Sequence, residues 1–131
     1  MLATDEVTAP IFGLAHTVSA TAPCVITVAI RSGRPVAAAE WPVPTSAPAV
    51  GEFLADSQAD EVALVVVADA RSAGRAIGCA DDLVAQLRAE HTVVRLCVHV
   101  PVLQSGVIWT SLLDQSDPGG LVTLMPPRAG L

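Results

Sequence analysis

Residues 59–103 read ADEVALVVVADARSAGRAIGCADDLVAQLRAEHTVVRLCVHVPVL, and this stretch decides the fold. Val62–Ala68 is apolar at every position, which is typical of a central strand buried on both faces. Asp69–Gly78 then predicts a loop or a frayed helix start, and Cys79–Glu90 has the apolar spacing of an amphipathic helix. A second β-rich run follows at Val93–Val102. The order strand, helix, strand predicts an α/β fold.

The run Val93–Val102 divides into two rows, because side chains of a strand alternate with a period of two residues. The alternation predicts one apolar row and one mixed row. The apolar row comprises Val94, Leu96, Val98 and Val100. The mixed row comprises Arg95, Cys97 and His99.

The residues before this stretch predict a β-hairpin. Cys24–Arg31 and Val36–Trp41 are two β-rich runs, and the turn signal Ser-Gly-Arg at 32–34 separates them. Pro35 and Pro42 bound the second run. Since proline removes a ladder donor, the second run is expected at an edge of the sheet.

A helix and two further strands complete the expected elements. Val50, Phe53 and Leu54 have the spacing of a helix face, after a proline-rich connector. After the deciding stretch, two short strands are expected at 107–113 and 121–125.

These elements predict a single two-layer α/β domain over residues 23–125. Its mixed sheet has five or six strands, and its two main helices pack mostly on one face. Residues 1–22 are expected to be weakly structured or to form a short helix, and residues 126–131 a tail. The other sheet face is partly apolar, so we expect this N-terminal helix or a second copy of the chain to cover it.

Composition narrows the class of protein. The chain has 131 residues, a net charge of −6, no long apolar run, and no Lys, Asn or Tyr, which favours a high-GC source. We expect no membrane span and no signal peptide. An acidic chain with two Trp and two Phe disfavours nucleic-acid binding. The odd set Cys24, Cys79 and Cys97 indicates reduced thiols and a cytoplasmic location.

Three segments carry a resemblance to a known family. They are PCVITVAIRSGRPVAAAEWPVP at 23–44, ADEVALVVVADA at 59–70 and LCVHVPVLQSGVIWTSLLD at 96–114. In order and spacing the chain resembles the DUF4192 family, an actinobacterial domain of unknown function, over roughly residues 23–125. It departs from the family in having one Trp where relatives often have Arg-Trp-Trp, and no Cys at 114–120. The resemblance implies the fold and the source, and no activity.

Asp69, Arg71 and Arg75 are the candidate ligand-binding residues, because they follow the carboxyl end of the central strand. Two guanidinium groups near a helix start could bind a carboxylate or a phosphate. The alternative interpretation is a solvated loop in which Asp69 caps the next turn.

No residue set predicts catalysis, a metal or a cofactor. Cys97 and His99 could supply two metal ligands, but a structural zinc site needs four. No nucleophile elbow occurs. The mixed row fits two other interpretations, burial under a helix or contact with a partner subunit.

Trp41, Arg95, His99 and Trp109 are the candidate interface residues, since Arg and Trp are enriched in interfaces. Each Trp is otherwise expected in the core. We therefore predict a small cytosolic non-enzymatic module that interacts with proteins, and with a second copy of itself in particular. The alternative is a protein or enzyme that binds a small anion at Asp69, Arg71 and Arg75. A third hypothesis is a regulatory protein of a phage or mobile element.

Overall fold

The computed structural model describes residues 3–18, 23–104, 106–113 and 120–122. Within these residues, three helices and six strands occur in the order α1, β1, β2, α2, β3, α3, β4, β5, β6. Their bounds are Ala3–Val18 (α1), Cys24–Arg31 (β1), Arg34–Pro42 (β2), Ala47–Asp56 (α2), Glu61–Val67 (β3), Ala73–Ala89 (α3), Val93–Val100 (β4), Ile108–Ser111 (β5) and Gly120–Leu121 (β6). The strands form one mixed sheet in the order β2-β1-β3-β4-β5-β6. The predicted single α/β domain is confirmed.

β3 is the central strand that the sequence predicts. It pairs with β1 in antiparallel orientation and with β4 in parallel orientation. Every residue from Val62 to Val67 is buried. Because both faces of β3 are covered, an alternating pattern of polar residues would have no place here.

The hairpin of β1 and β2 follows from its turn residues. Ser32 and Gly33 both have positive φ, 53° and 78°, as a two-residue turn of type I′ requires. β2 lies at the edge of the sheet, as expected from Pro35 and Pro42. The register with β1 shifts after Pro35, so Val36 is an extra, bulged residue.

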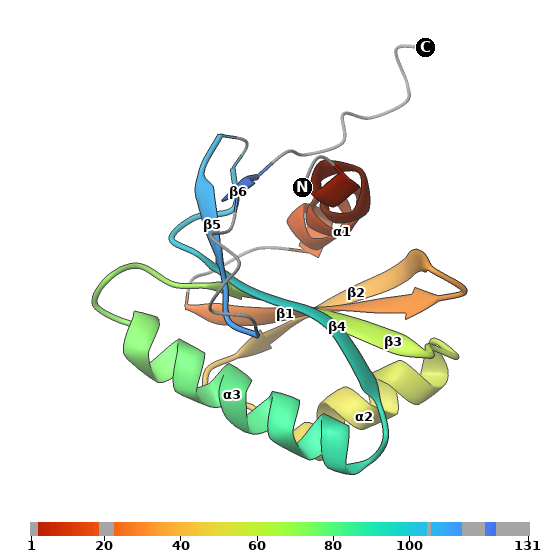
Figure 1. The fold of residues 1–131 in the computed structure, drawn as a ribbon. Helices are drawn as coiled ribbons and strands as arrows, with labels where there is room; N and C mark the ends of the chain where they lie inside the picture. The colour runs from red at the N-terminus through yellow and green to blue at the C-terminus, as the bar shows by residue number, and fades with distance from the viewer. Residues whose placement is uncertain (1–2, 19–22, 105, 114–119, 123–131) are drawn as a thin grey trace.

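Helices cover both faces of the sheet. In Figure 1, α2 and α3 lie on one face and α1 lies on the other, over β1 and β2. α1 is a helix of 16 residues, longer than the short N-terminal helix expected. It contributes Ile11, Phe12 and Ala15 to one core, while α2 and α3 pack against a second core on the opposite face. The chain's own α1 therefore adds a third layer to the two that were expected.

The start of α3 and the rows of β4 differ from the prediction. α3 begins at Ala73, within the segment predicted as a loop or a frayed helix start and six residues before Cys79. In β4 the register with β3 skips Arg95. After this bulge Cys97 shares a core with Val94, whereas Leu96 packs on the α1 side. The predicted single apolar row is wrong, since a bulge reverses the alternation.

β5 is shorter than the strand predicted at 107–113. β5 has four residues and β6 has two. Figure 1 shows both strands turning away from the plane of the sheet toward α1. The expected strand at 121–125 lies partly, and the expected tail at 126–131 wholly, outside the described residues. No described helix is long and apolar enough to cross a membrane.

Candidate functional site

The predicted ligand site begins with Asp69, which follows β3. The Oδ1 atom of Asp69 accepts hydrogen bonds from the backbone N–H of Arg71 (3.0 Å) and from the backbone N–H and hydroxyl of Ser72 (3.1 and 3.0 Å). Hydrogen bonds from Ser72, and then from the Arg71 backbone, hold the pKa of the Asp69 carboxyl below its usual value. The side chain therefore caps the turn at residues 70–72 that leads into α3, which is the alternative interpretation of this segment.

Arg71 and Arg75 lie at the same end of the sheet and are exposed. Within the described part of the chain, neither guanidinium has a hydrogen bond or an ion pair. The Asp69 carboxylate bonds the backbone of its own turn, and it forms no ion pair with either arginine. In the described structure this group thus consists of two exposed arginines beside a capped turn.

Arg95 and Glu61 form an ion pair at the opposite end of the sheet. The distance from Nη1 to Oε1 is 2.7 Å, and the two side chains are 41% and 23% exposed. Exposed pairs of this kind contribute about 0–1 kcal/mol to stability. Arg95 is thus available on the surface, while its charge is already paired within the chain.

His99 and Cys97 are committed to internal contacts. The Nε2 atom of His99 lies 2.8 Å from the carbonyl oxygen of Ala68, to which a protonated Nε2 donates. Burial raises the pKa of the Cys97 thiol to about 12. A buried thiol with a raised pKa is a poor nucleophile near neutral pH. No group of three or more metal-binding side chains occurs in the described residues.

The two tryptophans have different surroundings. Trp41 is half-buried on β2, where its Nε1–H donates to the hydroxyl of Thr27 at 2.8 Å and its ring meets Phe53 edge-on. Trp109 is 1% exposed and packs against Phe12, with ring centroids 6.2 Å apart. Trp109 therefore belongs to the core, and of the two predicted interface tryptophans only Trp41 reaches the surface.

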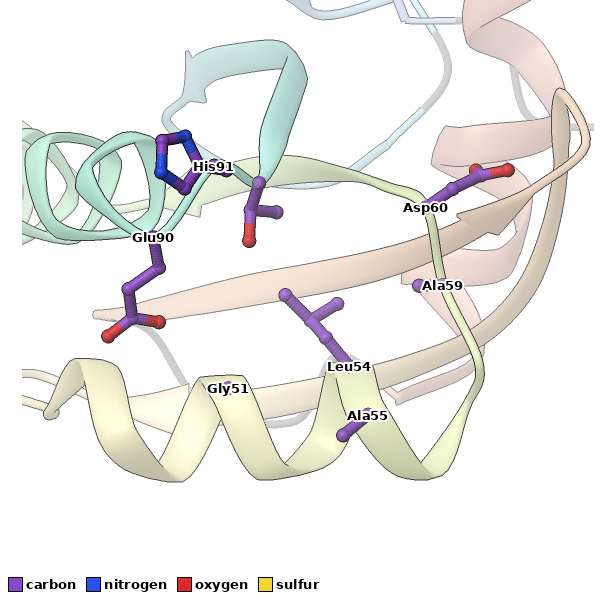
Figure 2. Close-up of a pocket in the computed structure, with 8 residues that line it drawn as sticks. Gly51, Leu54, Ala55, Ala59, Asp60, Glu90 and His91 are labelled. Carbon is purple, nitrogen blue, oxygen red and sulfur yellow. The ribbon is translucent and has the colours of Figure 1, made fainter.

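A pocket of about 360 Å³, which the sequence did not predict, lies between the ends of α2 and α3. Figure 2 shows Glu90 extending toward Gly51 of α2, while Asp60 points away from the groove. The Oδ2 atom of Asp60 accepts a hydrogen bond from the backbone N–H of Ser32. The carboxyl ends of two helices and the Glu90 carboxylate favour positive charge here. Since residues 51–60 and 90–92 are distant in sequence, no local motif marks the pocket.

No protein-family model, curated protein or solved structure matches the chain. The resemblance to the DUF4192 family thus stays a prediction, and function can be inferred only from the geometry.

Proposed function

We propose that the chain is a small non-enzymatic interaction module that self-associates through the edge of its sheet at β2. The observation that carries this proposal is the topology. β2 is the last strand in the order, it has nine residues, and no strand of the described chain lies on its outer side. An edge of this length presents backbone donors and acceptors on which another strand can pair.

The sheet faces offer less to a partner than the edge does. α1 covers β1 and β2 on one face, and α2 and α3 cover the other (Figure 1). All six residues from Val62 to Val67 are buried within the single chain. A second copy is therefore not required to cover a face, which leaves the edge as the favoured place for association.

The position of Trp41 also supports association at the β2 edge. Its side chain lies on β2, half-buried, and is held by Thr27 and Phe53. A rigid, partly exposed Trp loses little conformational entropy on binding and is among the residues that dominate interface energies. Arg95 and His99, the other predicted interface residues, lie on β4, two strands away from β1, and are engaged with Glu61 and Ala68.

A cytosolic location is part of the proposal. All three cysteines are free thiols, and Cys24 and Cys97 are buried. Burial, followed by the effect of Glu40, raises the pKa of the Cys24 thiol to about 12. Buried reduced thiols are typical of proteins kept in a reducing compartment.

Light scattering coupled to size-exclusion chromatography tests the proposal. We expect the molar mass to rise from that of one chain toward that of two as the loaded concentration increases. Aspartate substitution of Trp41 should shift the transition to higher concentration, and the same change at exposed Arg71 should leave it unchanged. A single-chain mass at every concentration would remove the proposal.

A further inference from the structure

The backbone groups of β2 that face outward can be assigned from one hydrogen bond. The carbonyl oxygen of Ile30 accepts a hydrogen bond from the backbone N–H of Asp60 at 3.0 Å. The backbone hydrogen-bonding groups of Ile30 therefore point toward β3. Antiparallel strands alternate between residues that bond to one neighbour and residues that bond to the other. The backbone N–H and C=O of Thr27, three residues earlier, therefore point toward β2, where Thr27 is paired with Ala39. Ala39 then bonds inward to β1, and Ala38 presents its N–H and C=O outward.

Prolines limit, at both ends of β2, the residues whose backbone N–H groups can point away from β1. Pro35 is paired with Ile30 and Pro42 with Cys24, so both belong to the outward positions by the same alternation. Neither has a backbone N–H. The bulge at Val36 further distorts the end of the strand near the turn. A second strand can therefore find outward donors only between the two prolines, and this restricts its register.

We infer that the partner strand is β2 of a second copy, antiparallel, with the two-fold axis at Ala39. This inference deepens the proposed self-association and rests on it. In this register Ala38 lies opposite Glu40 of the second copy, and its N–H donates to that residue's carbonyl oxygen. The two-fold axis repeats the same bond in the other direction, as an isologous contact requires.

The side chains fit this register as well as the backbone does. Ala39 meets Ala39 of the second copy at a close, non-hydrogen-bonded position, where Cα atoms are about 4.5 Å apart and small residues fit. Trp41 lies opposite Ala37 of the second copy, so a large ring meets a small side chain. Glu40 lies opposite Ala38, and no like charges face each other directly.

Replacing the outward donor tests the register. Ala38→Pro removes an N–H that makes no bond to β1, so the folded monomer should persist, as circular dichroism can verify. We expect the dimer dissociation constant to increase about tenfold or more. Ala38→Ser keeps the N–H and should dimerise like the parent chain. A folded Ala38→Pro variant that dimerises as tightly as the parent would overturn the inference.

A disulfide cross-link gives a second test that does not depend on weakening the dimer. In a Cys79→Ala background, Ala39→Cys should form a covalent dimer on mild oxidation, because the Cα separation suits a disulfide. Ala37→Cys lies on the same strand but opposite Trp41, and should not form one. If the Ala39→Cys variant dimerises without forming the cross-link, the register is wrong and the proposed function survives. If it is a monomer throughout, the proposed function itself fails.

Discussion

At one edge of the sheet β2 extends for nine residues beside β1, whereas at the other edge β5 and β6 have four and two residues. The long edge begins with a type I′ turn and is bounded by prolines. The short edge turns toward α1 and buries Trp109 against Phe12. Strand pairing thus organises the first edge and side-chain packing the second, so their substitutions should have different effects.

The largest expected effect is the loss of Trp109 packing. Trp109→Ala should lower the free energy of unfolding by about 3–5 kcal/mol, because a fully buried ring leaves a cavity. Trp41→Ala should cost less, about 2 kcal/mol, since its ring is half-buried. Urea denaturation measures both. An equal or smaller loss at Trp109 than at Trp41 would contradict the distinction between the two edges.

Alkaline pH gives the next effect, through one buried thiol near each edge. Cys24 on β1 and Cys97 on β4 have pKa values raised from 9.0 to about 12, while thiols in the unfolded chain ionise near 9.0. The unfolded state therefore releases protons first, and stability falls as pH rises above 9.0. One pH unit above that value, we expect a loss of about 1.4 kcal/mol for each thiol.

Denaturation curves of Cys24→Ala and Cys97→Ala separate the two contributions. Each variant should show about half of the alkaline decrease seen in the parent chain. If one variant keeps the full decrease, the thiol that it lacks is not buried as described, and the corresponding edge opens more readily than the other.

An effect of similar size is expected at Gly120 of β6. A Cβ atom at this position would lie 3.2 Å from Nε1 of Trp109, so Gly120→Ala forces the buried indole to move. Overpacking of this kind costs about 1–3 kcal/mol. Gly51→Ala in α2 is the matched control, because its Cβ would lie 3.9 Å from Oε1 of Glu90 and a helix favours Ala. A stability gain at Gly120 would show that this edge is loosely packed.

The smallest effect is expected at the start of α3, away from both edges. Asp69→Ala should lower the melting temperature slightly, because the carboxylate accepts hydrogen bonds from the turn that leads into α3. The pKa of Asp69 is lowered, so its stabilising effect is present above its usual pKa and is lost as pH falls. The difference from the parent chain should therefore shrink in acid. Arg71→Ala should leave the melting temperature unchanged, and binding of inorganic phosphate that Arg71→Ala abolishes would restore the predicted anion site.

Local patterns were sufficient for the centre of the fold. The unbroken apolar run Val62–Ala68 predicts the central strand, and the prolines around β2 predict its edge position. The exact start of α3 is harder to predict, because Gly74 and Gly78 favour a loop or a frayed helix start, although both lie within the helix. Glycine lowers helix propensity without forbidding the helix.

The features that could not be predicted depend on contacts between residues that are distant in sequence. The bulge at Arg95 leaves no trace in the sequence, since the alternation of polar and apolar residues around it looks regular. The burial of Trp109 depends on α1, whose packing onto the last strands no local pattern encodes. For the same reason, the sequence placed Trp41 and Trp109 together as interface candidates, and only the structure separates them.

Hydrogen exchange at the amide of Ala38 tests the central claim most directly. Ala38 presents its N–H outward, whereas the N–H of Ala39 faces β1, so Ala39 is the internal reference. We predict that protection of Ala38 rises with protein concentration in parallel with the dimer, while Ala39 stays protected throughout. Fast exchange at Ala38 in a sample that is fully dimeric would contradict association through β2.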